Sequence, residues 1–277
     1  MTIVVTVKVT DGMVLASDSA TTFMDHNGIP VKVYNNANKV FNLVKGLPLG
    51  AMTFGSGSIG TASIATLSKD LRIHFHNPDS PYYFDHANFS IEEVARLSRQ
   101  FFADRMAEAY PNGVESYYMG YRICGYGTHD TIAQGWEFSV QGDGVTEPTR
   151  FYESDHYGPR WSGDREALDR LILGFGRHLM PALMEVGLSE DKQEEVYNFL
   201  LSRNYQTLFL PAMPIQDAIE LARFLAETAS RFSHFSLQAP TIGGPIELAT
   251  ITKHEGFKWV ARKHYFNSSF NQGVNHA

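Results

Sequence analysis

Cysteine is almost absent from this chain of 277 residues, which contains only Cys124. A single cysteine excludes an intramolecular disulfide and is typical of a reducing compartment. Cys124 lies in the apolar run YRICGYG. We therefore expect a small buried hydrophobic residue at this position rather than a reactive thiol.

Long hydrophobic runs are also absent, since no stretch approaches the roughly 20 apolar residues that span a bilayer. The N-terminus begins as an alternating strand and lacks the charged and apolar regions of a signal peptide. We therefore expect a cytoplasmic protein with no membrane partner.

The sequence has no excess of positive charge, with 23 Lys and Arg against 30 Asp and Glu and a net charge of −7. This balance argues against a nucleic-acid partner. Hydrophobic residues make up 43% and charged residues 19%, as in ordinary globular proteins. Internal repeats and low-complexity linkers are lacking, so we predict a single domain over residues 1–277 with a polar tail at 267–277.

Segments with the two-residue hydrophobic period of strands alternate along the chain with segments that have the 3.6-residue period of helices. We expect strands at 2–9, 13–17, 39–44, 49–54, 117–127, 136–141, 149–152, 245–252 and 257–263, and helices at 61–73, 90–110, 164–179, 190–202 and 214–232. Tight hairpin signals such as Asp11-Gly12 favour antiparallel pairing. The predicted fold is α+β, with two antiparallel sheets face to face, helices on both outer faces, and a helical excursion at about 175–213.

Thr2 is the candidate nucleophile. If Met1 is removed, Thr2 carries a hydroxyl and a free α-amine on one residue. An α-amine has an ordinary pKa of about 7.7–8.0, so it can accept the hydroxyl proton near neutral pH. This unit needs no distant histidine, which suits a sequence without an evident Ser-His-Asp spacing.

Asp18 and Lys39 are the candidates for tuning that amine. The hairpin at Asp11-Gly12 folds the strand that ends at Asp18 back beside Thr2. A neighbouring ammonium lowers the pKa of an amine by like-charge repulsion, and Lys39 could supply it if a carboxylate oriented the lysine. An Asp at a strand end and a Lys at a strand start are also common solvated residues.

A family resemblance connects these positions. The segment TIVVTVKVTDGMVLASDSATT resembles the N-terminus of mature proteasome β-type subunits and of related bacterial peptidase rings. In that family a carboxylate follows the nucleophilic Thr by sixteen residues, which is the spacing of Thr2 and Asp18. The segment NANKVFNL is similar to the family's lysine segment and implies a catalytic role for Lys39.

The same resemblance implies the substrate-binding residues. AMTFGSGSIG is similar to the family's oxyanion segment, so the Gly57 N–H would face the developing oxyanion. Thr22 and Gly57 would pair with the backbone of an extended peptide, in the manner of an added strand. Gly55 would lie beside the pocket for the substrate side chain.

The resemblance is less regular in the second half of the chain. RWSGDREALDRLILG is similar to a Gly-Ser-Gly segment of the family and implies that Ser162 supports the N-terminal amine. The family's supporting Asp and second Ser would fall near Ala239 and Ile242. This sequence therefore has an alanine and an isoleucine where the family has an acid and a serine. Thr241 or Ser236 could substitute for them.

The resemblance implies the four-layer αββα sandwich of N-terminal-nucleophile hydrolases, with stacked homo-oligomeric rings around a proteolytic chamber. The expected substrate is a peptide or unfolded protein, with no cofactor and no metal. Whether an ATPase or cap feeds the chamber is left open. The two imperfect support positions also motivate an alternative, a ring or scaffold protein with weak or no catalysis.

Two other motifs point to different chemistry. Residues 55–60 read G-x-G-x-x-G, the pattern of dinucleotide-binding loops, but no second buried strand with an acidic end follows. His74 and His76 lie two apart at a helix end, where their side chains diverge. We expect neither a dinucleotide site nor a metal site from these motifs.

Overall fold

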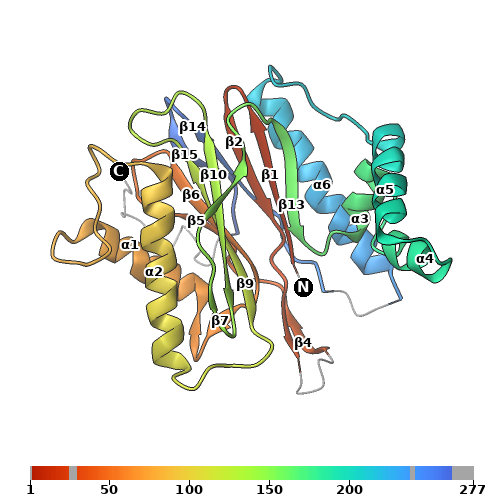
Figure 1. Ribbon diagram of the computed structural model, residues 1–277. Coiled ribbons are helices and arrows are strands. Elements are labelled where there is room, and N and C mark those ends of the chain that lie inside the picture. Colours follow the sequence, from red (N-terminus) through yellow and green to blue (C-terminus); the bar gives the residue numbers. More distant parts are fainter. Residues whose placement is uncertain (1, 25–29, 238–240, 264–277) are drawn as a thin grey trace.

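The computed structural model describes residues 2–24, 30–237 and 241–263, and two antiparallel sheets hold most of its strands (Figure 1). The first sheet has the order β13 (Gly158–Gly163), β1 (Ile3–Val9), β2 (Gly12–Ser17), β14 (Glu247–Thr252), β15 (Gly256–Ala261). The second has the order β11 (Gly144–Val145), β10 (Gln134–Gln141), β9 (Tyr118–Gly125), β6 (Leu49–Gly55), β5 (Val40–Asn42), with β12 (Thr149–Tyr152) paired to β10. Two small hairpins are separate from these sheets: β3 (Thr21–Met24) with β4 (Pro30–Tyr34), and β7 (Ser58–Ile59) with β8 (Ala62–Ser63).

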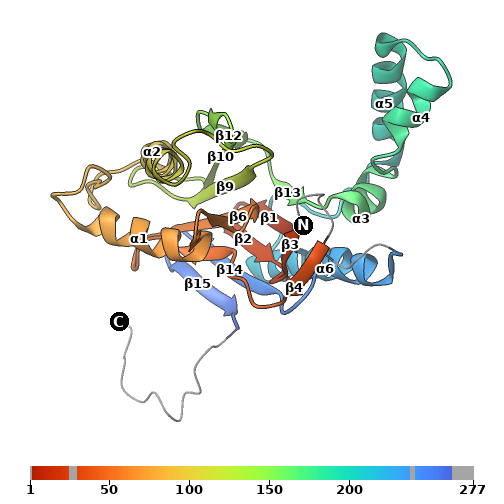
Figure 2. The ribbon, with the colours of Figure 1, turned by 90° about the horizontal axis from the view of Figure 1, so that it is seen from below.

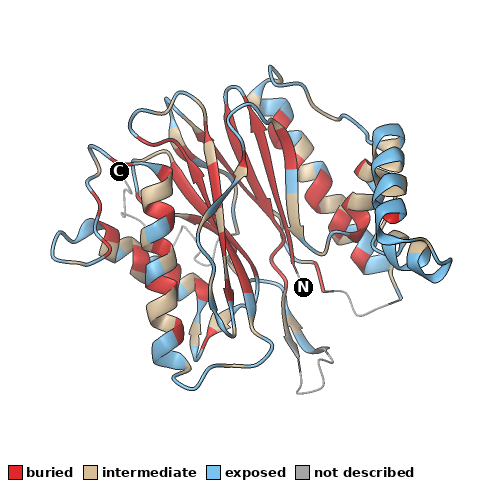
Figure 3. Cartoon of the chain, in the orientation of Figure 1, coloured by how far each residue is buried: buried red, intermediate tan, exposed pale blue. Residues whose placement is uncertain are grey.

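Helices cover the outer face of each sheet (Figures 1 and 3). The long helix α6 (Ile215–Phe235) packs on β1 and β2. Helices α1 (Ile64–His76) and α2 (Ile91–Ala109) share one hydrophobic cluster with the second sheet. Helix α2 begins where its sequence predicts, because the Ser90 hydroxyl accepts a hydrogen bond of 3.1 Å from the Glu93 N–H.

Strand β1 shows why the two sheets stack. All seven of its residues are buried. Because side chains alternate along a strand, Ile3, Val5 and Val7 enter the cluster under α6, whereas Val4 enters the cluster between the sheets. A strand that is apolar on both faces needs a layer on each side, and the second sheet supplies one of them.

The helix predicted at 164–179 is wrong in its extent. Helix α3 covers Glu166–Leu168, and a π-helical turn (Asp169–Leu173) completes it. Gly174 then adopts a left-handed conformation with φ of 84°, which ends the helix in the way glycine commonly does.

Strand β13 was not predicted from the sequence, and it contains Pro159. β13 is an edge strand of its sheet, and proline is tolerated at an edge because one side of the strand needs no donors.

A helical arm follows Gly174 and points away from both sheets (Figure 2). It consists of α4 (Leu179–Glu185) and α5 (Glu190–Asn204). Gln193 is the one residue of α5 that is buried, and none of α4 is. In the part of the chain that the structure describes, no helix is long and apolar enough to cross a membrane.

Truncating Leu225 tests the packing of α6 on the first sheet. Leu225 is fully buried, so Leu225→Ala should lower the free energy of unfolding by roughly 2–5 kcal/mol, the usual cost of such a cavity. The adjacent Phe224 is 49% exposed, and Phe224→Ala should cost much less. Urea denaturation measures both, and an equal loss in the two variants would contradict this packing.

Cys124 should be inert in the folded protein. It is fully buried between the sheets, and burial raises the pKa of its thiol to about 12. Because the thiolate is the reactive form, a thiol reagent at pH 8 should label Cys124 only after unfolding in urea. Rapid stoichiometric labelling of the native protein would contradict both the burial and the raised pKa.

Candidate active site

One cleft of about 1000 Å³ brings together most of the residues singled out in the sequence. Its lining includes Thr2, Thr22, Lys39, Gly55 and Gly57. These residues come from the chain preceding β1, from β3, from the chain preceding β5, and from the end of β6 and the loop after it. The rest of the lining is mainly Ser, Thr, Asn and Tyr, so Lys39 is its one charged residue among those described.

Asp18 lies behind this cleft and is fully buried. Its Oδ1 accepts a hydrogen bond of 2.7 Å from Lys39 Nζ and one of 3.1 Å from the Ile3 N–H. Its Oδ2 accepts from the N–H groups of Ala20 at 3.0 Å and Gly243 at 3.1 Å. Four donors thus surround one carboxylate, which is the condition under which a charge can be buried.

The register of the first hairpin explains why Asp18 lies beside Thr2. Val4 pairs with Ser17, so the next residue along β2 lies opposite Ile3. The Asp18 N–H accordingly donates to the Ile3 carbonyl at 3.3 Å. The sixteen-residue spacing from Thr2 to Asp18 is therefore a consequence of antiparallel pairing around the turn at Asp11-Gly12.

Lys39 is 5% exposed and carries the charge nearest to the cleft. Burial lowers the pKa of its ammonium below the ordinary value, while the charge and hydrogen bond of Asp18 act in the opposite direction. Lys263 lowers the pKa of Lys39 further and Glu247 raises it. The ammonium is thus held by one direct partner and by a second, more distant ion pair.

That second ion pair was not foreseen from the sequence. Lys263 Nζ lies 3.0 Å from Glu247 Oε2, and both side chains are buried. The same ammonium donates to Ser19 Oγ at 2.7 Å and to the Ala37 carbonyl at 2.6 Å. Since Ser19 follows Asp18 and Ala37 precedes Lys39 by two residues, Lys263 fixes both segments that carry the first ion pair.

Ser162 is not among the residues that line the cleft. It pairs with Val4, and its hydroxyl accepts a hydrogen bond of 2.6 Å from Arg122. Asp164 is the residue opposite Thr2, because its N–H donates to the Thr2 carbonyl at 2.7 Å. The register between β1 and β13 therefore brings Asp164 to Thr2, two residues beyond the predicted serine.

Gly163 explains how closely β13 approaches the N-terminus. Its φ is 97°, a conformation that L side chains rarely adopt. A Cβ at this position would also overlap the Thr2 carbonyl oxygen. Glycine is therefore required between Ser162 and Asp164.

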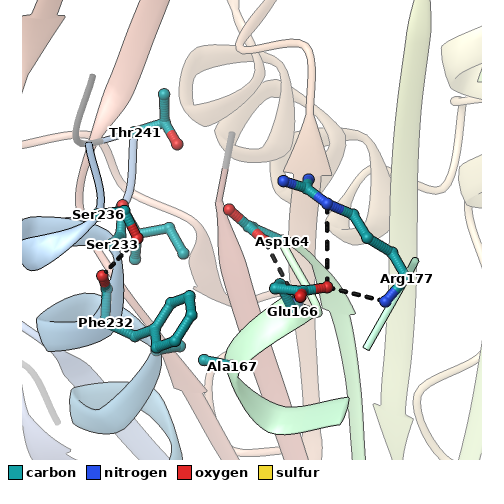
Figure 4. A pocket seen from close by; sticks show the side chains of 10 residues that line it. Asp164, Glu166, Ala167, Arg177, Phe232, Ser233, Ser236 and Thr241 are labelled. Atoms are coloured by element: carbon teal, nitrogen blue, oxygen red, sulfur yellow. Dashed lines mark hydrogen bonds and ion pairs between the residues drawn. The ribbon is translucent and has the colours of Figure 1, made fainter. Parts of the chain in front are cut away.

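A second, small cavity of about 40 Å³ lies next to Asp164 (Figure 4). Thr241 and Ser236, which the sequence offered as substitute supporting residues, line it together with Asp164. Ile242 also lines it and is a buried apolar residue, while Ala239 lies outside the described residues.

The alternative motifs do not form the sites their patterns suggest. Strand β6 pairs antiparallel with both β5 and β9, and the β7–β8 hairpin separates it from α1. The parallel βαβ unit of a dinucleotide-binding site is therefore missing at residues 55–60. Within the described ranges, no group of three or more His, Cys, Asp or Glu side chains is arranged to hold a metal ion.

Comparison with known proteins gives a structural likeness without a sequence match. No protein-family model matches the chain, and no curated protein matches it significantly. A solved structure of the helical assembly of the Anbu complex from Pseudomonas aeruginosa has a TM-score of 0.53 at 14% identity, covering 97% of this chain and 89% of that one.

Two further Anbu structures are similar. Anbu (ancestral beta-subunit) from Yersinia bercovieri has a TM-score of 0.53 at 12% identity, covering 95% of this chain and 88% of that one. An Anbu (Gly-1) mutant from Hyphomicrobium sp. strain MC1 has a TM-score of 0.51 at 10% identity, with coverages of 96% and 89%. The chain therefore has an α+β fold shared with Anbu proteins over nearly its whole length.

The two partners of the buried ion pair should differ in their contribution to stability. Asp18→Asn leaves the Lys39 ammonium buried without its counter-charge, and breaking such a pair costs about 3–5 kcal/mol. Lys39→Met leaves a carboxylate that still accepts three backbone N–H bonds, so its cost should be smaller. Urea denaturation of both variants measures the difference, and a greater loss for Lys39→Met would contradict the arrangement.

Proposed function

We propose that this chain is a threonine peptidase of the N-terminal-nucleophile class, active after Met1 has been removed. The observation that supports it best is the Asp18–Lys39 ion pair of 2.7 Å, beside the Ile3 N–H and behind a cleft lined by Thr2. A buried ammonium held next to an N-terminal amine favours the neutral form of that amine, which is the form that can act as a base.

In the proposed reaction, the α-amine of Thr2 takes the proton of its own hydroxyl, directly or through one water. The Thr2 oxygen attacks the scissile carbonyl carbon, and the Gly57 N–H stabilises the negative oxygen that develops. When the C–N bond breaks, the proton on the α-amine passes to the leaving amine. Water then attacks the ester carbonyl, giving up a proton to the α-amine, and the acid product leaves as Thr2 regains its hydroxyl proton.

Apart from Lys39, the described lining of the cleft is uncharged, which suits an extended peptide backbone. Thr22 and Gly57 would pair with the substrate as a neighbouring strand does, with Gly55 beside the pocket for a substrate side chain. Gly57 approaches β3 closely, since a Cβ there would lie 3.0 Å from Thr21 Oγ1. The two segments are therefore adjacent, and in this proposal a substrate strand would lie along them in the cleft and not between them.

Asp164 is our candidate for the support that the family places near Ala239 and Ile242. Its N–H already holds the Thr2 carbonyl, and its side chain borders the small cavity with Thr241. A carboxylate here could orient the α-amine once that amine is free. Ser162 would then act indirectly, by holding Arg122 between the sheets.

The proposed assembly is a homo-oligomeric ring or stack of one-domain subunits with the αββα sandwich of N-terminal-nucleophile hydrolases. The order of helices and sheets is compatible with that sandwich, and one of the similar structures is a helical assembly of Anbu. An assembled protein with little or no catalysis is the second candidate, and the apolar Ile242 at an expected serine position favours it.

Two substitutions at Thr2 separate these candidates. Thr2→Ala removes the nucleophile and should abolish hydrolysis of a panel of fluorogenic peptides, whereas Thr2→Ser should retain a measurable part. Alanine and serine are both small, so removal of Met1 is expected in each variant. The mass of the intact protein shows whether Met1 has been removed. Thr66→Ala, on the exposed start of α1 and outside the cleft, is the matched control.

Sedimentation velocity shows whether the variants keep the assembly of the unmodified chain. Turnover that survives in Thr2→Ala would overturn the assignment of the nucleophile. Absence of turnover in the unmodified chain, on protein with a proven Thr2 N-terminus, would favour the inactive assembly.

A further inference from the structure

A separate cavity of about 120 Å³ lies beside β5, the strand that follows Lys39. Its lining comes mainly from β5, α1, β15 and the residues next to them. It is lined by Asn38, Val40, Phe41, Asn42, Lys45, Lys69, Arg72, Glu247, Trp259 and Arg262. Asn38 is shared with the large cleft, so the two cavities are separated by one segment of chain.

The lining of this cavity is strongly cationic. It contributes two lysines and two arginines against one carboxylate, Glu247. Glu247 is 1% exposed, and its charge is already opposed by Lys263 at 3.0 Å. Among the described residues, neither Arg72 nor Arg262 forms an ion pair with a carboxylate, so the cavity has an excess of positive charge.

Three polar atoms in the lining make no hydrogen bond, and one of them, Glu247 Oε2, is ion-paired with Lys263 at 3.0 Å. Arg72 Nε is buried and makes no hydrogen bond, although it is a donor. Asn42 Oδ1 is likewise buried without a partner, although it is an acceptor. Buried polar atoms normally have partners, so a ligand that both accepts and donates would satisfy Arg72 Nε and Asn42 Oδ1 at once.

The arginines of this cavity are held in different ways. Arg262 lies over the ring of Trp259, with 4.7 Å from its guanidinium carbon to the ring centroid, which restricts its direction without using its donors. Arg72 is half-buried on α1, where burial and the charge of Arg262 lower the pKa of its guanidinium. An anion between the two guanidinium groups would relieve their repulsion.

We propose that this cavity binds a phosphate group, either as inorganic phosphate or as the phosphoryl end of a small monoester. Guanidinium groups match the paired oxygens of a tetrahedral oxyanion. A singly protonated phosphate also carries an O–H, which can donate to Asn42 Oδ1, whereas sulfate and carboxylates at neutral pH have no donor. The cavity is far larger than the ~10–15 Å³ that one water requires, so it has room for such an ion.

Isothermal titration of the full chain with inorganic phosphate in a phosphate-free buffer tests the proposal. Saturable binding of one phosphate per chain is expected, and Arg72→Gln and Arg262→Gln should each weaken it at least tenfold. Arg96→Gln, on the exposed face of α2, is the matched control and should bind as the unmodified chain does. Absent binding, or binding unchanged in both cavity variants, would overturn the proposal.

Titrations with other anions test the chemistry of the ligand. Sulfate should bind at least tenfold more weakly than phosphate, and Asn42→Ala should narrow that difference. Equal affinity for sulfate and phosphate in the unmodified chain would overturn the assignment of a phosphate ligand. Glycerol phosphate distinguishes the two sources, because binding as tight as that of phosphate identifies a monoester, and much weaker binding identifies the free ion.

Separate control experiments check the folding of each variant and the independence of phosphate binding from catalysis. Thermal unfolding in phosphate-free buffer checks each variant, and if Arg72→Gln does not fold, Lys69→Gln at an exposed position takes its place with the same expected loss. A ligand that binds the native state must also raise the melting temperature. Thr2→Ala should bind phosphate normally, so failure of the peptidase proposal and failure of this one are distinguishable.

Discussion

The buried carboxylate of Asp18 is the constraint on which the rest of the site depends. A charge without water must be surrounded by donors, and these come from Ile3, Ala20, Lys39 and Gly243. The first two are local to the opening hairpin, whereas the last two come from other parts of the chain. One carboxylate therefore ties the N-terminus, the segment before β5 and the segment before β14 to a common point.

The hydrogen bonds and ion pair of Asp18 lie at the ends of strands. Apolar side chains, in contrast, pack the two sheets and their helices together. Arg122 is an exception, since it lies between the sheets at 4% exposure, 2.5 Å from Glu137 and 2.6 Å from Ser162. Its guanidinium also lies over the ring of Phe54, which lines the cleft. The sheet that carries the cleft wall is thus joined to the sheet that carries the N-terminus.

The sequence predicts well what depends on neighbours along the chain. The hairpin at Asp11-Gly12 places Asp18 beside the N-terminus, and Ser90 marks the start of α2, because turns and caps are local. It does not predict that Asp164 lies opposite Thr2, since this depends on how β13 aligns with β1 across more than half of the chain. The pairing of Lys263 with Glu247 is unpredicted for the same reason. Gly174, by contrast, is the residue type that commonly ends a helix, and the helix predicted at 164–179 ran through it.

The hydrogen bond that the Gly243 N–H donates to Asp18 determines when the site can be completed during synthesis. On a ribosome, residues 2–18 are available early, but the segment that completes the shell around Asp18 emerges only after most of the chain has been made. A partly synthesised chain therefore lacks the finished surroundings of Thr2, however well its first hairpin has formed. The order of synthesis itself delays assembly of the site until nearly the entire polypeptide is present.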